Sequence, residues 1–188
     1  FEKISKILQQ KAHETVLEIN LNSLIHNLNY YRSRLKPQTK IMAMVKATSY
    51  GSGSFEIANL LQFHKVDYLT VAYADEGVEL RKAGIALPIM VMNAEEITFD
   101  VMLQYNLEPE LFSFGIFDAF ERYVRQSGLH HYPVHLKLDT GMRRLGFEET
   151  DIPALCERLR ATQCFKVQSV FSHLAASDSP EHDGFTRQ

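Results

Sequence analysis

A single lysine stands at the end of an apolar run near the start of the chain. Residues 41–45 read Ile-Met-Ala-Met-Val, and Lys46 follows them, ahead of a loop that contains Tyr50 and two glycines. Five apolar residues in a row are typical of a parallel strand that is buried on both faces. Lysine is seldom buried, and barrels and open sheets carry their chemistry at the carboxyl ends of such strands. A desolvated lysine has a lowered pKa and can form a Schiff base with an aldehyde cofactor; the alternative is a side chain that reaches solvent from a strand end.

Two more polar features follow apolar strands. The segment 137–146, Lys-Leu-Asp-Thr-Gly-Met-Arg-Arg-Leu-Gly, holds one carboxylate and three cations around a glycine. Arginine presents a planar fork that suits a carboxylate or a phenolate; the alternative is a surface cluster in which Asp139 pairs with a neighbour. His173 ends the predicted strand 167–173, where a histidine is either packed in the core or catalytic. Because all three features fall at the same ends of their strands, they indicate an active site.

The elements that position these residues alternate between strand and helix. We expect strands over 41–45, 68–72, 88–92, 108–112, 134–138 and 167–173, and helices over 54–63, 74–83, 95–105, 117–126 and 152–160. Such alternation predicts a parallel sheet wrapped by helices, an α/β fold. The chain has no GxGxxG or GxxxxGK[ST] motif, which favours a (β/α)8 TIM-type barrel over a nucleotide-binding sheet. A complete barrel takes roughly 250 residues, so these 188 residues, with about six β/α units, are expected to form an incomplete barrel.

The first forty residues stand outside this repeat. Helical spacing in a polar setting predicts a linker or connecting helix at the very start. Residues 15–21 alternate like a half-buried strand, and a helix capped by Asn22 or Ser23 is expected to run to about Leu35. The chain is therefore expected to divide into a linker or connecting helix, a leading strand with a helix, and a partial barrel, over 1–14, 15–40 and 41–188.

Composition excludes several classes of protein. The formal net charge is −3 and basic blocks are missing, which argues against nucleic acid as a partner. Apolar runs are too short to span a membrane, so no membrane partner is expected. Two cysteines without a CxxC pair fit a cytoplasmic protein with neither a disulfide framework nor a zinc site. His131 and His135 have a metal-like spacing, but Pro133 between them argues against a shared helix face, and we expect an exposed turn and no metal.

Four segments of the sequence resemble the alanine racemase family in order and spacing, and the resemblance runs from about residue 15 to the end. The segment around Lys46 resembles the family's cofactor signature and is the most specific of the four. The resemblance implies a pyridoxal 5'-phosphate enzyme of the barrel type, usually a homodimer with a second, mostly β domain that is absent from this sequence. The four segments are 18–24, 45–53, 139–146 and 171–175.

The resemblance also implies roles for single residues. Lys46 corresponds to the lysine that holds pyridoxal phosphate as an internal aldimine and acts as the base on the D-side of the substrate. Tyr50 corresponds to the tyrosine that bonds the cofactor phosphate, and His173 to the histidine beside the pyridine ring. Arg144 corresponds to the arginine near the cofactor's phenolic oxygen and the substrate carboxylate. Lys137 stands where many members carry a carbamylated lysine that fixes this arginine. The chain departs from the common family pattern at Thr48, Ser49 and Arg143.

The activity that the resemblance implies is the interconversion of L-alanine and D-alanine by two bases acting through a pyridoxal-phosphate aldimine, which supplies D-alanine for peptidoglycan. The second base and the partner of the pyridine nitrogen are expected beyond residue 188, so this segment alone is expected to be inactive. The character of residues 1–14 is compatible with a linker from a UDP-N-acetylmuramoyl-tripeptide:D-alanyl-D-alanine ligase, as in bifunctional ligase–racemases of cell-wall synthesis.

Two other functions are compatible with parts of the sequence. A non-catalytic pyridoxal-phosphate-binding barrel protein would share the strand-end lysine but should lack the motif at 139–146, which is present. A related amino-acid racemase, aldolase or decarboxylase on the same barrel would keep the lysine and differ in the second domain. The substrate side chain is left open by the sequence.

Overall fold

The structure, a computed structural model, describes residues 15–187 and divides the chain into two compact units, residues 1–39 and 40–188. The connecting helix expected over 1–14 lies outside the described residues. In the first unit, helix α2 (Leu21–Arg34) begins at the N-cap Asn20, whose side chain accepts a hydrogen bond from the backbone N–H of Ser23 at 3.1 Å. The helix therefore starts two or three residues earlier than the sequence indicated, because the Asn20 side chain accepts from the first turn and serves as the N-cap in place of Asn22 or Ser23.

The strand expected over 15–21 is wrong. Residues 15–20 form no strand and are all exposed, and Leu17 keeps 76% of its surface accessible. Alternating apolar and polar residues form a strand only where a neighbouring strand pairs with the backbone and a core packs against the apolar face. Neither is present for this segment within the part of the chain that the structure describes.

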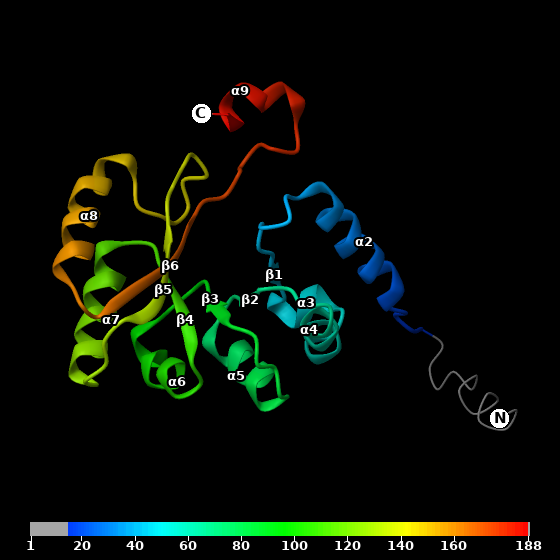
Figure 1. Cartoon of the computed structure of the whole chain (residues 1–188), viewed down its shortest axis with the longest axis horizontal. Coiled ribbons are helices and arrows are strands. Elements are labelled where there is room, and N and C mark those ends of the chain that lie inside the picture. Colours follow the sequence, from blue (N-terminus) through cyan, green and yellow to red (C-terminus); the bar gives the residue numbers. More distant parts are fainter. Residues whose placement is uncertain (1–14, 188) are drawn as a thin grey trace, which may run out of the picture. The chain divides into compact units, whose positions relative to one another are not determined.

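The second unit is built on one sheet of six parallel strands in sequential order (Figure 1). Each strand pairs with the next, beginning with Met42 beside Tyr68 and ending with β5 against β6. Sequential parallel strands joined by right-handed crossovers place all their helices on one face of the sheet, as in a barrel. The six strands thus form a half-barrel, which confirms the fold class expected from the sequence. They are β1 (Met42–Met44), β2 (Tyr68–Val71), β3 (Ile89–Val91), β4 (Leu107–Leu111), β5 (Tyr132–Lys137) and β6 (Phe165–Phe171).

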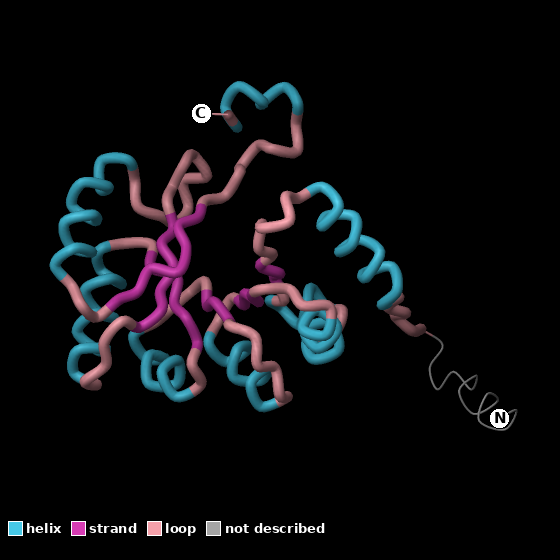
Figure 2. Tube along the Cα trace, in the orientation of Figure 1, coloured by secondary structure: helices cyan, strands magenta, loops and turns pink. Residues whose placement is uncertain are grey.

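The connecting helices lie along the sheet (Figure 2). Most bounds agree with the sequence pattern to within three residues, because capping residues and glycines mark them locally. Helix α7 (Phe114–Gln126) begins three residues before the expected start, after the N-cap Ser113, whose hydroxyl accepts from the Ile116 N–H at 3.4 Å. The helical elements are α3 (Lys46–Gly51), α4 (Ser54–Phe63), α5 (Ala74–Lys82), η1 (Glu96–Thr98), α6 (Phe99–Gln104), α7 (Phe114–Gln126), η2 (Glu149–Asp151), α8 (Ile152–Ala161), η3 (Pro180–His182) and α9 (Asp183–Thr186). Among the described residues, no helix is long and apolar enough to cross a membrane.

An aromatic cluster packs the helices onto the sheet. Phe120 of α7 has its ring centroid 4.9 Å from that of Phe99 and 5.9 Å from that of Phe165 on β6. Phe117 meets Phe165 edge to face at 5.0 Å. Each such buried ring stabilises the fold by about 1.5–3 kcal/mol relative to exposure. The cluster thus packs α6 and α7 against β6.

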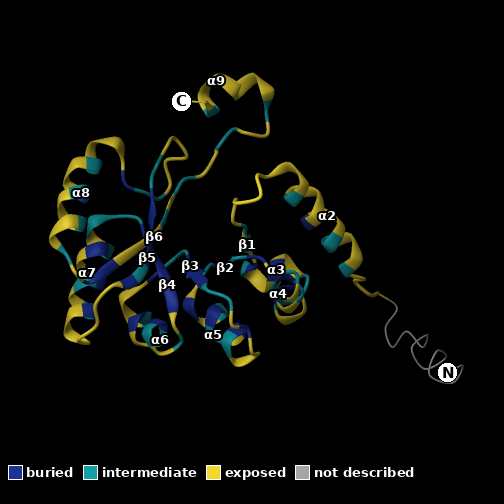
Figure 3. Ribbon diagram, viewed as in Figure 1, coloured by how far each residue is buried: buried dark blue, intermediate teal, exposed yellow. Residues whose placement is uncertain are grey.

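The strands differ in burial across the sheet (Figure 3). Every residue of β3 and β4 is buried, whereas β1 alternates between exposed and half-buried residues. In β6, Val170 is 56% exposed. Within the described residues β1 and β6 are the two edges of the sheet, and their apolar side chains are only partly covered.

Candidate active site

Lys46 follows β1 directly, and the backbone after it takes an unusual path. Ala47 to Tyr50 have φ between 50° and 56°, one left-handed helical turn made of four residues that are not glycine. Each such residue costs roughly 1–2 kcal/mol relative to a right-handed conformation. The sequence predicted only a loop here. Runs of strained backbone persist where the surroundings hold them in place, and they concentrate at functional sites.

Glu76 of α5 helps to fix the left-handed turn after Lys46. Its Oε1 accepts a hydrogen bond from the Ala47 N–H at 2.6 Å, and its Oε2 accepts from Ala72 and Tyr73 at 2.6 and 3.2 Å. One carboxylate thus joins the end of β2, the first turn of α5 and the residue after Lys46. The bonds to charged oxygens offset part of the cost of the left-handed turn and position the lysine.

Lys46 lines a cavity of about 190 Å³ at the carboxyl ends of the strands. Lys137, the last residue of β5, and Arg144, from the loop after it, line the same cavity. The structure therefore brings together three of the residues singled out in the sequence. The remaining lining residues are Ala72, Met92, Asn93, Glu110 and Leu145. Three cations around a small cavity suit a ligand that carries several anionic groups.

Glu110 is the residue of this cavity that sequence reasoning missed. It lies on β4, and its side chain has no solvent exposure, while Lys137 is 5% exposed. The Lys137 Nζ lies 3.3 Å from the Glu110 Oε1, and neither carboxylate oxygen accepts an aligned hydrogen bond. Burial raises the pKa of Glu110 to about 7, although Lys137 and, more weakly, Arg144 act in the opposite direction. The signal available in the sequence was the Glu-Pro-Glu stretch inside a short strand, which places two acids on one face.

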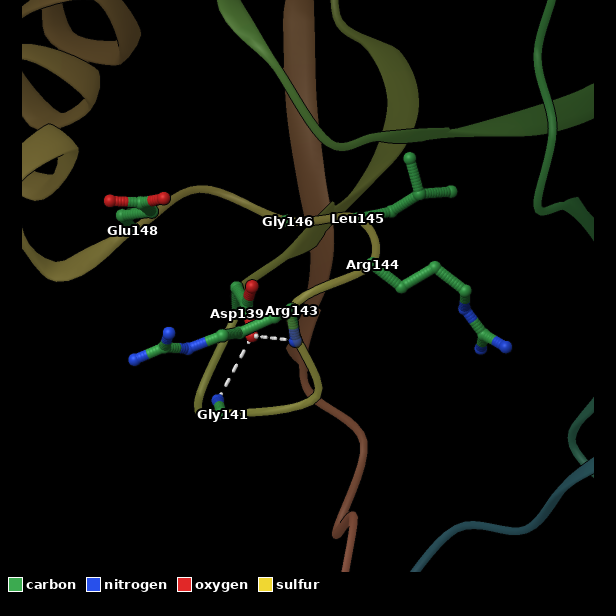
Figure 4. A pocket seen from close by; sticks show the side chains of 7 residues that line it. All are labelled: Asp139, Gly141, Arg143, Arg144, Leu145, Gly146 and Glu148. Carbon is green, nitrogen blue, oxygen red and sulfur yellow. Dashed lines mark hydrogen bonds between the residues drawn. The ribbon is translucent and has the colours of Figure 1, made fainter.

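The loop after β5 presents its two arginines in opposite directions (Figure 4). Asp139 accepts hydrogen bonds from the N–H groups of Gly141 and Arg143 at 2.9 and 3.0 Å, and these backbone bonds lower the pKa of its carboxyl group. Asp139 therefore shapes the loop rather than forming the surface ion pair considered as an alternative. The Arg144 side chain extends away from Asp139, and that of Arg143 extends to the other side (Figure 4).

Gly146 closes the loop at a point where no other residue fits. Its φ is +136°, and a Cβ at this position would lie 2.4 Å from the backbone nitrogen of Asp139. The loop folds back so closely that Phe147 donates to the Lys137 carbonyl at 2.8 Å and accepts from Asp139 at 2.9 Å. This close return places Arg144 next to the end of β5. A second, larger hollow of about 590 Å³ opens beside the loop, lined by Asp139, Gly141, Arg143, Arg144, Leu145, Gly146 and Glu148.

Two residues expected in the site are not among those that line the 190 Å³ cavity. Tyr50 is 65% exposed, and its hydroxyl lies 2.9 Å from the Met44 sulfur. His173 is exposed and lies two residues past the end of β6. The neighbouring Ser172 hydroxyl contacts the Thr140 hydroxyl, which ties this segment to the arginine loop. The roles expected for Tyr50 and His173 stay predictions.

A second polar cluster lies below the cavity, inside the half-barrel. His135 Nε2 lies 2.9 Å from the Glu108 Oε2, and His135 Nδ1 lies 2.7 Å from the Ser169 hydroxyl. The Tyr68 hydroxyl donates to the same Glu108 oxygen at 3.1 Å, and burial together with Glu108 raises the pKa of Tyr68 to about 12. The exposed turn expected at His135 is therefore wrong: its side chain is fully buried on β5, because alternation along the strand turns it into the barrel. Among the described residues, no group of three or more His, Cys, Asp and Glu side chains could hold a metal ion.

Comparison with known proteins places this geometry in a family. Residues 19–188 match the family described as alanine racemase, N-terminal domain. An alanine racemase of Thermodesulfovibrio yellowstonii is 36% identical over 167 residues, covering 87% of this chain and 45% of that protein. An amino-acid racemase of Enterococcus faecalis is 34% identical over 187 residues, covering 95% of this chain and 25% of that protein.

The solved structures that resemble this chain are alanine racemases as well. An alanine racemase of Clostridium difficile 630 superposes with a TM-score of 0.82 at 33% identity, covering 90% of this chain and 48% of that one. An alanine racemase from a D-cycloserine-producing Streptomyces lavendulae superposes with a TM-score of 0.81 at 27% identity. The chain spans about half the length, or less, of these relatives. Because the match extends over nearly all of the half-barrel and over the loops at its strand ends, the chain belongs to the alanine racemase N-terminal domain family.

Proposed function

We propose that this chain forms the cofactor-binding part of a pyridoxal-phosphate enzyme that interconverts L-alanine and D-alanine. The observation that carries the proposal is the shared cavity of Lys46, Lys137 and Arg144 at the strand ends of a family member. A primary amine facing two further cations suits a cofactor that offers an aldehyde and anionic oxygens. The residues present therefore fit the cofactor.

The cofactor, once bound, would supply the electron-withdrawing system that acidifies the substrate Cα–H bond. Lys46 would hold it covalently and then carry the Cα proton on one face of the substrate. Arg144 would bind an anionic oxygen of the cofactor and the substrate carboxylate with charge-assisted hydrogen bonds. Tyr50 would contact the cofactor phosphate, and His173 would lie against its ring. Racemisation needs a second base on the opposite face, which in this proposal comes from outside residues 15–187.

The wider setting belongs to the same proposal. The full-length protein would act as a cytoplasmic homodimer and supply D-alanine for peptidoglycan, with neither nucleic acid nor membrane as a partner. A preceding ligase domain would make it a bifunctional cell-wall enzyme. The division into a connecting helix, a leading helix segment and a partial barrel, over 1–14, 15–40 and 41–188, is also part of the proposal.

A second candidate is a racemase for another small amino acid. The similarity to the amino-acid racemase of Enterococcus faecalis extends over 187 residues and favours it. Incubating the full-length protein in D2O with each of several small amino acids, both enantiomers, separates the two. Fastest exchange of the Cα proton with alanine supports the main proposal, and fastest exchange with another amino acid supports the second.

The cofactor assignment is tested by trapping at Lys46. The full-length protein should absorb at the blue edge of the visible spectrum, and borohydride should fix the cofactor covalently on the peptide that contains Lys46. Lys46→Ala should abolish both signals. Lys82→Ala, on the exposed side of α5, is the matched control and should keep them. A Lys46→Ala protein that still traps the cofactor would refute the assignment.

A further inference from the structure

Glu76 does more than cap the helix that carries it. It is the third residue of α5, where a glutamate commonly returns one oxygen to the backbone at the helix start, as its Oε2 does to the Tyr73 N–H at 3.2 Å. The same oxygen accepts from the Ala72 N–H at 2.6 Å. The other oxygen, Oε1, is not needed for this cap and accepts at 2.6 Å from the N–H of Ala47, 29 residues earlier in the chain. The stability of α5 alone therefore does not account for this contact.

The contact with Ala47 fixes the peptide group that follows Lys46. On the other side of the lysine, the Val45 N–H donates to the Thr70 carbonyl at 2.9 Å, so that β2 holds the preceding residue. The Lys46 ammonium itself has no hydrogen bond or ion pair within the described residues. The position of Lys46 in the cavity is therefore set by its backbone, and that backbone is held by β2 and by Glu76.

The backbone that Glu76 holds is strained. Ala47 to Tyr50 all have positive φ, a conformation that is unfavourable for residues other than glycine and persists where the surroundings hold it in place. A carboxylate accepts stronger hydrogen bonds than a neutral group does. Without the Glu76 charge, the turn should relax toward ordinary backbone conformations and move Lys46 with it.

We propose that Glu76 is a positioning residue that acts through Lys46: its carboxylate holds the turn from which the lysine captures the cofactor aldehyde and carries the substrate proton. The inference rests on the proposed function and deepens it, because it assigns part of the lysine's reactivity to a residue that is not among those lining the 190 Å³ cavity. Arg144, which would bind the substrate carboxylate, lies on another loop. Loss of Glu76 should therefore lower kcat far more than it changes KM.

The first measurement reports on the turn without any reaction. In the full-length protein freed of cofactor, amide hydrogen exchange at Ala47 is compared with that of Glu76→Gln, in which one oxygen becomes an NH2 group that cannot accept. The remaining oxygen should stay with Ala72 and Tyr73, so exchange at Ala47 should become at least about tenfold faster. Asp75→Asn removes the other acidic charge from the first turn of α5 and is the matched control. Unchanged exchange in Glu76→Gln would overturn the inference.

The second measurement reports on the lysine. Pyridoxal phosphate is mixed with each full-length protein, and capture by Lys46 is followed through the absorption band and borohydride trapping. Glu76→Gln should slow capture at least about tenfold and lower kcat for alanine by a similar factor, with KM within about twofold of the natural value. Asp75→Asn should leave all three quantities unchanged. Equal losses in the two variants, or a loss confined to KM, would contradict a role through Lys46.

A third variant distinguishes a displaced lysine from a general loss of folding. Glycine adopts positive φ without strain, so Thr48→Gly, at an exposed position of the turn, reduces the need for the carboxylate. The losses of capture rate and kcat caused by Glu76→Gln should therefore be smaller in the Thr48→Gly background than in the natural protein. Losses of the same size in both backgrounds would show that Glu76 does not act by holding the strained turn.

The outcomes separate this inference from the proposed function. If the natural protein fails to capture the cofactor at Lys46, the function fails, while amide exchange at Ala47 still reports whether Glu76 holds the turn. If the natural protein captures the cofactor and racemises alanine, and Glu76→Gln does both equally well, the function stands and the inference falls.

Discussion

Two buried pairs of ionisable residues join β4 and β5, two residues apart along each strand, and they differ in how completely the protein satisfies their hydrogen bonds. In the lower pair, Glu108 and His135 are 2.9 Å apart, and Tyr68 and Ser169 complete their hydrogen bonds. In the upper pair, Glu110 and Lys137 are 3.3 Å apart, and Glu110 has no aligned donor. The lower pair is completed by the protein itself, as expected of groups that stabilise a fold. The upper pair lines the cavity that Lys46 also lines, and the protein supplies no aligned donor to its carboxylate.

The largest expected effect is on stability, from the lower pair. Glu108→Ala removes the shared acceptor of Tyr68 and His135 and leaves both buried without it, which should destabilise the protein by about 3–5 kcal/mol. Chemical denaturation of the full-length protein measures the loss, with Glu79→Ala as the surface control. The folded fraction should keep its kcat/KM. A loss of activity at unchanged stability would place Glu108 in the chemistry and erase the contrast between the pairs.

The next effect is on catalysis, from the loop above the upper pair. Arg144→Ala should raise the barrier expressed by kcat/KM by about 2–5 kcal/mol, because its charge-assisted contacts in the cavity are lost. Arg143→Ala should change it by less than about 0.5 kcal/mol, since its side chain extends the other way. Steady-state kinetics on the two variants decides between them. Equal losses would contradict the orientation of the loop.

A smaller effect concerns the pH dependence of stability. The pKa of Glu110 is raised from 4.5 to about 7, so the folded protein holds this proton more tightly than the unfolded chain does. The stability due to the protonated carboxyl is fully present below pH 4.5 and is lost as the pH rises through about 7, a difference of about 3 kcal/mol. Unfolding measured across this range should show the decline in the natural protein and a flatter curve in Glu110→Gln. Identical slopes would show that Glu110 titrates normally.

The smallest expected effect is a loss of stability when one partner of the lower pair is removed. Ser169→Ala removes the partner of His135 Nδ1 and should cost about 1 kcal/mol, because one neutral hydrogen bond is lost at the edge strand. Lys166→Ala, exposed on the same strand, serves as the control in the same denaturation experiment. A cost as large as that of Glu108→Ala would mean that the histidine depends on both partners equally.

Most elements of the half-barrel could be predicted from the sequence because their signals are local. The glycine after Lys82 and Ala83 marks a helix end, and apolar runs such as Ile89–Val91 mark buried strands. The loop of Arg144 was equally visible, since its glycines and charges form a contiguous motif. These features depend on residues close together in the chain, which is why pattern alone located them.

The sequence by itself determined the strand–helix order, the strand-end lysine and the arginine loop. Only the tertiary structure decided that Ala47 to Tyr50 form a left-handed turn, that His135 is buried against Glu108, and that 15–20 is not a strand. It also placed Glu110 against Lys137, residues from different strands. Each of these depends on a partner far away in the chain: Glu76 for the turn, β4 for His135, and a neighbouring strand for 15–20. Hydrogen bonds and ion pairs between distant segments leave no periodic trace in the sequence, because their energy depends on the three-dimensional arrangement that brings the two partners together.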